Sequence, residues 1–187
     1  MGQIPHYFIA IPVSTELKEK FFTWQESLKQ NISYKVWPHQ EDLHITLKFL
    51  GAVEEQQLKQ LRNNLATIIH TAFTLTVGGI GTFGKHDNPR VVWAGVKKNT
   101  NLEGLFLKIE SVVTEIGFPS ENRPYRPHIT LAKKWLESYH ARALDEAKEQ
   151  FAADYFQMNV DEFVLYQIYP SKSPKYQIVE RYRLKRG

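Results

Sequence analysis

Hydrophobic positions along the chain follow two periodicities, and together they predict a protein of mixed helices and strands. Runs of β-branched and aromatic residues predict strands at residues 7–11, 43–50, 74–77, 91–96, 128–132, 159–168 and 176–184. Apolar residues at helical spacing predict helices over residues 15–30, 54–70, 102–116 and 138–151. We expect loops at residues 31–42 and 122–127, and a glycine-rich connection at residues 78–88.

The order of these elements occurs twice, with a shift of 84 residues. The tetrapeptide His44-Ile45-Thr46-Leu47 recurs as His128-Ile129-Thr130-Leu131. Elements of one type coincide under this shift, so that Ala10 falls on Ala94, although most side chains differ. The period is too long for a solenoid, whose repeats span about 20–50 residues. We therefore expect a single domain over residues 1–187, built of two similar lobes whose equivalent residues meet at a shared cleft.

Composition removes several classes of chemistry. The chain has 187 residues and no cysteine, which excludes disulfides, a thiol nucleophile, cysteine-bound zinc and iron–sulfur clusters. A content of 42% hydrophobic and 24% charged residues is that of a globular protein. No apolar run reaches the ~18 residues of a membrane span, and the first residues lack the pattern of a signal peptide. We expect a cytoplasmic protein that does not bind membranes.

Positive charge is concentrated at the C-terminal end. The net charge is +4, and residues 170–187 carry six Lys and Arg residues against one Glu. A basic segment on a near-neutral body favours a polyanionic partner such as nucleic acid. A solvated tail that aids solubility has the same composition, and charge alone leaves both interpretations open.

The duplicated tetrapeptide carries the candidate chemistry. Because strand side chains alternate, His44 and Thr46 point to one face while Ile45 and Leu47 point to the other, and the second copy behaves in the same way. An imidazole transfers protons at neutral pH, and a hydroxyl can donate to phosphate oxygens. A lone histidine is more often a structural core residue. The same polar pair at matching points of two lobes favours catalysis that requires no metal or other cofactor.

With these motifs and their flanks, the chain resembles the 2H phosphoesterases, which are named for two His-x-Thr/Ser-x motifs. Within them it is similar to the RNA 2′,3′-cyclic phosphodiesterases, formerly called 2′-5′ RNA ligases. The resemblance extends over nearly the whole chain. It is carried by residues 8–12, 44–51, 81–84, 89–95 and 126–133.

The resemblance implies a bilobal α+β fold with largely antiparallel sheets flanked by helices and an active site in the central cleft. It implies hydrolysis of a 2′,3′-cyclic phosphate at the end of an RNA or oligonucleotide, without metal or ATP and with no obligatory protein partner. By family role, His128 is the proton acceptor that activates water, and His44 is the proton donor to the leaving 3′ oxygen. Thr46 and Thr130 hold the phosphate oxygens.

Three basic residues near the motifs are further candidates for substrate binding. Family members usually have Arg where this chain has Lys133, which keeps the charge but loses the bidentate geometry. By alternation Lys133 faces away from His128. Lys48 lies on the face of His44 by alternation, where it either meets a phosphate or is solvated. Arg126 lies two residues before His128, on the same face by alternation, and we expect it to aid phosphate binding.

Other features of the sequence are weaker. The segment 79–84 spells the G-x-G-x-x-G of dinucleotide-binding proteins, but a turn follows where that fold needs a helix, so we reject a nucleotide-binding fold. Trp37, Phe83 and Tyr125 lie on predicted loops near the motifs, where they either stack on a base or pack on the core.

Two other functions use the same residues. One is a single-strand RNA end-binding module that grips a terminal phosphate without turnover. Two proton-transfer groups count against it, because binding alone does not need them. The other is the reverse reaction, in which a cyclic phosphate and a 5′-hydroxyl are joined in a 2′-5′ linkage. The abundance of water favours hydrolysis as the net direction.

Overall fold

The computed structural model describes residues 4–86, 88–136 and 141–186. Its strands are β1 (His6–Pro12), β2 (Tyr34–Val36), β3 (His44–Ala52), β4 (Phe73–Lys85), β5 (Asn88–Val96), β6 (His128–Trp135), β7 (Tyr155–Val160), β8 (Glu162–Ile168) and β9 (Tyr176–Arg183). Its helices are α1 (Thr15–Lys29), α2 (Glu55–Leu65), α3 (Thr100–Glu115) and α4 (Ala141–Gln150), with a short 3₁₀ helix η1 (Gln40–Asp42).

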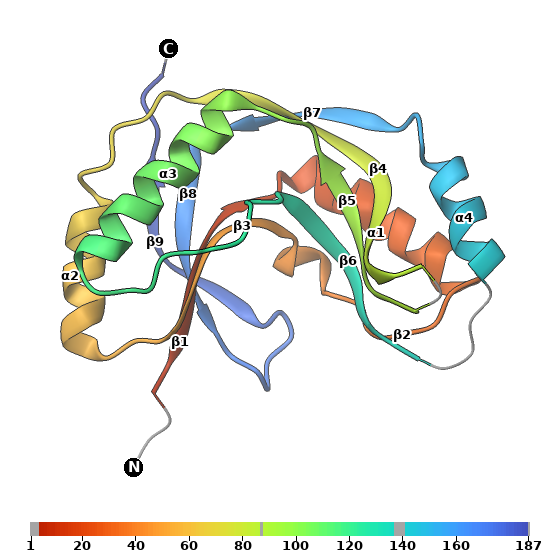
Figure 1. Ribbon diagram of the computed structural model, residues 1–187, viewed down its shortest axis with the longest axis horizontal. Coiled ribbons are helices and arrows are strands. Elements are labelled where there is room, and N and C mark those ends of the chain that lie inside the picture. Colours follow the sequence, from red (N-terminus) through yellow and green to blue (C-terminus); the bar gives the residue numbers. More distant parts are fainter. Residues whose placement is uncertain (1–3, 87, 137–140, 187) are drawn as a thin grey trace.

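The described strands form a single antiparallel sheet in the order β7-β4-β5-β6-β3-β1-β8-β9, and β2 adds to β6 (Figure 1). The two motif strands, β3 and β6, are neighbours at its centre, where Ile45 lies opposite Ile129. This confirms the predicted α+β architecture. The two lobes are the two halves of one continuous sheet.

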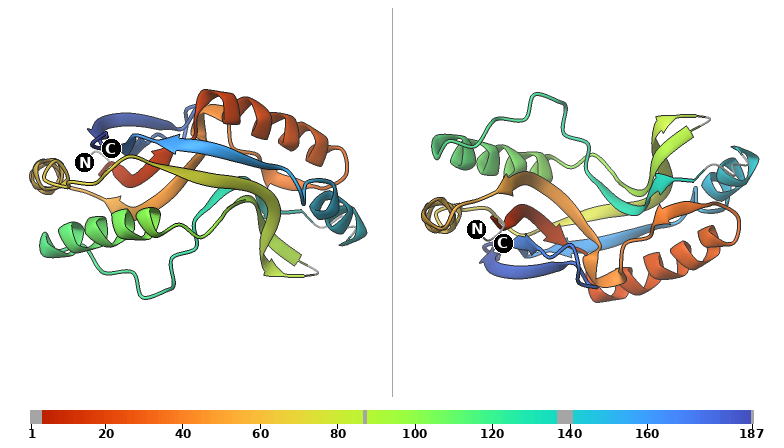
Figure 2. Two further views of the ribbon diagram at one scale, coloured as in Figure 1. Left: turned by 90° about the horizontal axis from the view of Figure 1, so that it is seen from above. Right: turned by 90° about the horizontal axis from the view of Figure 1, so that it is seen from below.

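The two repeats exchange strands across this centre. The first repeat supplies β1 and β3 to one half, but its last strand, β4, pairs with β5 in the other half. The second repeat supplies β5 and β6, and its β8 pairs with β1. Helices α1 and α4 accompany the half that contains β4, whereas α2 and α3 accompany the half that contains β8 (Figures 1 and 2). The exchange makes the two halves depend on each other for their cores.

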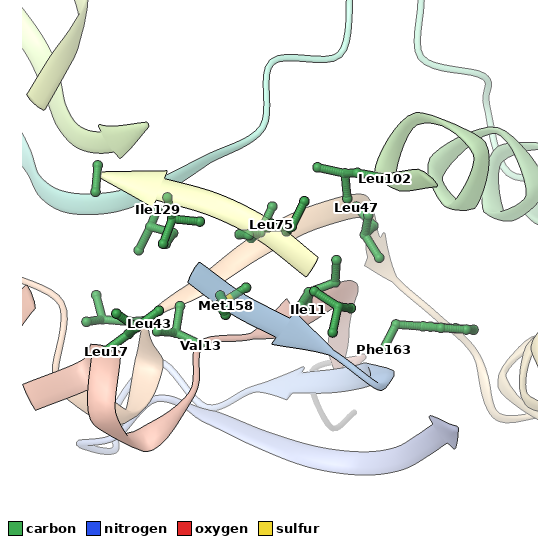
Figure 3. Packing of buried hydrophobic residues seen from close by; sticks show 14 of the residues in the cluster. Ile11, Val13, Leu17, Leu43, Leu47, Leu75, Leu102, Ile129, Met158 and Phe163 are labelled. Atoms are coloured by element: carbon green, nitrogen blue, oxygen red, sulfur yellow. The ribbon is translucent and has the colours of Figure 1, made fainter. Parts of the chain in front are cut away.

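The main hydrophobic core fills the space between the sheet and the helices. Figure 3 shows side chains from several strands and from α1 and α3 packed in one cluster, including Ile11, Leu17, Leu102 and Ile129. A smaller cluster covers the opposite face of β1 and contains Phe8, Ala10, Val164 and Tyr166. Strand β1 is therefore covered on both faces, and the smaller cluster lies on the side of the motif histidines.

The glycine-rich connection predicted at residues 78–88 is wrong, because β4 continues through it and forms a hairpin with β5. The small residues are needed for close packing. A Cβ placed on Gly81 would lie 2.0 Å from the ring of Trp93, so the indole occupies the space of the missing side chain. A strand, not a helix, follows Gly79, which agrees with the rejection of a nucleotide-binding fold.

Other element boundaries also differ from the prediction. The predicted loop at residues 31–42 contains β2 and η1, α2 ends at Leu65, and residues 159–168 are divided between β7 and β8. The start predicted for the last helix, residue 138, lies outside the described residues. Ile11 lies opposite Ile45 and Ala94 lies opposite Ile129, so the sheet register makes Ile11 the equivalent of Ala94. The predicted equivalence of Ala10 and Ala94 is therefore wrong by one residue. No helix within the described ranges is long and apolar enough to cross a bilayer.

Candidate active site

The four polar residues of the two motifs lie at one cleft. Ile45 and Ile129 face each other in the core, so the residues on either side of them, His44, Thr46, His128 and Thr130, point to the opposite face. All four line a cleft of about 1110 Å³. The antiparallel register brings His44 beside Thr130 at one end of this group, and Thr46 beside His128 at the other. The motifs thus meet as the duplication predicts.

The two imidazoles are oriented by matching hydrogen bonds. Nδ1 of His44 lies 2.7 Å from the carbonyl oxygen of Asp42, and Nδ1 of His128 lies 2.7 Å from that of Arg126. A carbonyl oxygen only accepts, so Nδ1 carries the hydrogen in each ring. The unprotonated nitrogen of each neutral ring is then Nε2, which is the atom available for proton transfer.

Thr46 contacts the first histidine directly. Its Oγ1 lies 3.0 Å from Nε2 of His44. With the ring neutral, the hydroxyl donates to Nε2. When Nε2 is protonated, the ring becomes the donor, and the Thr46 hydroxyl hydrogen is free to bind another acceptor. The protonation state of His44 therefore decides what Thr46 can bind.

Each motif ends in a β-bulge. Neighbouring residues of β1 pair with Thr46 and Lys48, so Leu47 has no partner on that strand. Strand β6 has the same irregularity at Leu131, where neighbouring residues of β5 pair with the residues on either side. A bulge inserts one residue and reverses the alternation of faces beyond it. Side chains after Leu47 and Leu131 consequently point opposite to the faces expected from a regular strand.

The bulge at Leu131 turns Lys133 into the cleft. Lys133 lies opposite Val91, on the same face as Thr130, and it lines the cleft. The prediction that it faces away from His128 is wrong for this reason. Its ammonium group has no ion-pair partner among the described acidic residues. Burial and the neighbouring charge of Lys175 lower its pKa.

The bulge at Leu47 has the opposite effect on Lys48. Lys48 lies opposite Ile9, a core residue, so the prediction that it shares the face of His44 is wrong. Its buried ammonium lies 2.7 Å from a carboxylate oxygen of Glu110 on α3 and 2.7 Å from the carbonyl oxygen of Pro119. The side chain borders one end of the cleft, but its charge is already paired. Its predicted part in substrate binding stays a prediction.

Arg126, Tyr125 and Phe83 line the same cleft, whereas Trp37 is not among its described lining residues, and Phe83 lies on β4 and not on the predicted loop. Arg126 is exposed at its rim, and its part in phosphate binding stays a prediction. Tyr125 stacks on Phe106 with ring centroids 4.1 Å apart, and its hydroxyl donates to the carbonyl oxygen of Thr46 at 3.0 Å. The ring of Phe83 lies edge-on to the ring of His128, with ring centroids 4.8 Å apart. Trp37 lies edge-on to Tyr34, with ring centroids 6.1 Å apart.

The surroundings of the histidines favour their neutral forms in the free protein. The pKa of His44 is lowered to about 4, mainly by burial and in addition by the charges of His128 and Lys133, whereas Asp42 opposes the shift. Burial also lowers the pKa of His128, while its bond to the Arg126 carbonyl opposes the shift. His44 in the free protein therefore binds its proton less tightly than a histidine in water.

Comparison with known proteins places the chain in a family. The model of the LigT like phosphoesterase family matches residues 11–93 and 96–176. The chain belongs to this family. This confirms the 2H phosphoesterase resemblance, and the fold agrees with that of solved members. Among the part of the LigT-like phosphoesterase that the structure describes, no group of three or more His, Asp or Glu residues is arranged to hold a metal ion.

Three relatives of this LigT-like phosphoesterase show how far the similarity extends. The RNA 2′,3′-cyclic phosphodiesterase of Bacillus subtilis is 35% identical and covers 96% of this chain and 97% of its own length. That of Geobacillus stearothermophilus is 34% identical over 96% of this chain, which spans only 57% of that relative. The crystal structure of Escherichia coli LigT complexed with 3′-AMP superposes with a TM-score of 0.81 at 27% identity, covering 97% of this chain and 99% of that one.

Two buried polar residues of this LigT-like phosphoesterase support the site and were missed from the sequence. The carboxylate of Asp42 accepts hydrogen bonds from the backbone nitrogens of Lys175, at 2.9 Å, and Tyr176, at 3.0 Å. Nε2 of Gln25 donates to the carbonyl oxygens of Leu131, at 2.8 Å, and Pro38, at 3.0 Å. Gln25 was detectable, because it is a polar residue within the apolar stripe of its helix. Asp42 left no such signal.

Proposed function

We propose that this protein hydrolyses the 2′,3′-cyclic phosphate at RNA 3′ ends to a 2′-phosphate, with His44 and His128 as proton-transfer groups and without a metal ion. The observation that carries the proposal is the matched pair of Nδ1 bonds, which leaves Nε2 of both rings for chemistry at one cleft. The relatives named RNA 2′,3′-cyclic phosphodiesterase support the choice of substrate.

His128 acts as the general base. Its Nε2 takes a proton from a water molecule, and the water oxygen attacks the phosphorus from the side opposite the 3′ oxygen. The neutral ring is the form needed for this step, and burial of His128 favours that form. The contact of Phe83 with the ring restricts its orientation.

His44 acts as the general acid. Its Nε2 proton passes to the 3′ oxygen as the bond between phosphorus and that oxygen breaks. The products are a free 3′-hydroxyl and a phosphomonoester on the 2′ oxygen. Each histidine then returns to its starting form by proton exchange with water. A bound anionic phosphate raises the pKa of His44, and so opposes the effect of burial when the proton is needed.

The hydroxyls of Thr46 and Thr130 and the ammonium of Lys133 stabilise the charge that develops on the phosphate oxygens. Protonation of His44 releases the Thr46 hydroxyl for this purpose, because the ring no longer accepts its hydrogen. Protonation of His44 and binding of the phosphate therefore favour each other.

An oligonucleotide that ends in a 2′,3′-cyclic phosphate tests the proposal when it is incubated with the protein in excess chelator. We expect a 2′-phosphate product, and a loss of about 10²–10⁴-fold in kcat for His44→Ala and for His128→Ala. His86→Ala, on the exposed β4–β5 turn, is the matched control. A 3′-phosphate product, loss of activity that zinc restores, or near wild-type rates in both active-site variants would overturn it.

The same incubation separates the two alternatives. A pure end-binding module retains the oligonucleotide but gives no 2′-phosphate. Ligation by the reversed reaction gives a 2′-5′ linkage when a 5′-hydroxyl strand is added, and it uses the same two histidines with their roles exchanged. Cytoplasmic location and the absence of an obligatory protein partner belong to the same proposal.

A further inference from the structure

Unpaired positive charges gather at the His44 end of the cleft. Lys133 and Lys134 come from β6 and line the cleft. Lys175 comes from the hairpin that joins β8 to β9, at the lower centre of Figure 1, and lies close enough to Lys133 for its charge to lower the pKa of that ammonium. None of the three has an ion-pair partner among the described acidic residues. Like charges held together repel one another, so the cluster is stabilised when an anion binds.

Asp42 fixes the hairpin at this place. Asp42 is only 5% exposed. Its carboxylate accepts hydrogen bonds from the backbone nitrogens of Lys175 and Tyr176, while its carbonyl oxygen accepts one from Nδ1 of His44. Tyr176 lines the cleft, and its ring lies edge-on to that of His44 with centroids 5.4 Å apart. One buried residue thus holds both the hairpin and the proposed general acid.

The proposed reaction fixes the direction in which the RNA leaves the phosphorus. His44 protonates the 3′ oxygen, which belongs to the ribose of the terminal nucleotide, so that ribose lies at the His44 end of the cleft. The next phosphodiester of the strand is attached to the 5′ side of the same ribose. It therefore extends toward Lys133, Lys175 and the hairpin. If the histidines had the opposite roles, the strand would extend toward Arg126.

We propose that Lys175, beside Lys133, provides a second phosphate subsite that binds the phosphodiester on the 5′ side of the terminal nucleotide, and that Asp42 is its positioning residue. The inference rests on the proposed function, because it takes its direction from the role of His44. It predicts that the protein prefers oligonucleotides over a cyclic mononucleotide, which has no such phosphodiester.

The test compares kcat/KM for a dinucleotide and for a mononucleotide that both end in a 2′,3′-cyclic phosphate. We expect Lys175→Ala to lower the ratio of the two values by about 1.5- to fivefold, the range for one exposed charged contact. Added salt should lower the ratio in the wild-type protein more than in this variant. Lys172→Ala is the matched control, because Lys172 lies on the same hairpin with its ammonium 3.9 Å from the centroid of the Tyr169 ring.

Asp42→Asn should lower the same ratio, because its amide nitrogen cannot accept a hydrogen bond from the hairpin backbone. An unchanged ratio in Lys175→Ala, or an equal fall in Lys172→Ala, overturns the subsite. A lower ratio in Arg126→Ala alone also overturns the subsite, because the RNA strand would then leave the phosphorus at the other end of the cleft. Failure of the proposed function looks different, because neither substrate would then be hydrolysed by the wild-type protein.

Discussion

The hydroxyl oxygen of Thr46 lies 3.0 Å from Nε2 of His44, the nitrogen that we propose delivers a proton to the substrate. In the free protein the hydroxyl donates to this nitrogen, which favours the unprotonated ring. A phosphate that draws the hydroxyl hydrogen toward itself removes this donor and at the same time attracts a proton to the ring. Substrate binding and the charging of His44 are therefore coupled through one side chain.

This coupling predicts that a bound anion raises the pKa of His44. In the free protein burial places this pKa at about 4. Titration with inorganic phosphate, followed by NMR of the imidazole signals, should move the titration midpoint of His44 to higher pH. The signals of His86, on the exposed β4–β5 turn, serve as the control and should not respond. Saturation with phosphate that leaves the His44 midpoint in place would contradict the coupling.

The pH dependence of kcat/KM follows from the order of the two pKa values in the free protein. The active form has His44 protonated and His128 neutral. The pKa of His44 is the more strongly lowered of the two. The acidic limb of the bell should therefore follow His44 and the alkaline limb His128, which is the reverse of the order that their roles alone would suggest.

The pKa values of His44 and His128 in the free protein both lie below the ordinary histidine pKa of about 6.5. The maximum of kcat/KM should therefore lie on the acid side of that pH. Rates measured at low substrate concentration across the acid and neutral range check this expectation. A maximum on the alkaline side of pH 7 would show that the free protein does not hold its histidines in the neutral form.

The face occupied by Lys48 predicts a role in stability. Lys48→Met leaves the largely buried carboxylate of Glu110 without its cation, and we expect a loss of about 3–5 kcal/mol in the free energy of unfolding. The double variant with Glu110→Leu should recover part of the loss, because no charge is then left unpaired. Denaturant unfolding measures both. Full stability of Lys48→Met would mean that the ion pair contributes little.

Gln25 is expected to support the bulge that orients Lys133. Gln25→Leu leaves the carbonyl oxygens of Leu131 and Pro38 without their donor, at a cost of about 1–3 kcal/mol for the buried carbonyl of Leu131. KM for the cyclic phosphate should rise as well, because the bulge is no longer held. Gln30→Leu, at the exposed end of the same helix, is the control. A change in stability with KM unaffected would limit Gln25 to a structural role.

Alternation within a strand was enough to predict from the sequence that the four polar motif residues share one face. It failed immediately after each motif, at Leu47 and Leu131, because a leucine is compatible with both a regular strand and a bulge. The sequence therefore showed that Lys48 and Lys133 are basic residues close to the motifs, but it did not show which face of the sheet each side chain occupies. The bulge at Leu131 accepts a hydrogen bond from Gln25, a residue distant in sequence.

The sheet topology was predictable only in part for the same reason. Element types followed from local periodicity, whereas the exchange of β4 and β8 between halves depends on pairing between distant segments. The glycines of β4 look like a loop in isolation. They belong to a strand because Trp93, from the neighbouring strand, packs over Gly81. Tertiary contacts here decide the structure that local propensity leaves open.

The division of labour between the two histidines is tested most directly with a substrate that does not need an acid. In a cyclic phosphate whose 3′ oxygen is replaced by sulfur, the leaving thiolate departs without protonation. We predict that His44→Ala recovers most of its lost rate on this substrate, measured in single turnover, whereas His128→Ala remains impaired on both substrates. Equal losses for the two variants on the sulfur substrate, or recovery of His128→Ala alone, would contradict the assignment of His44 as acid and His128 as base.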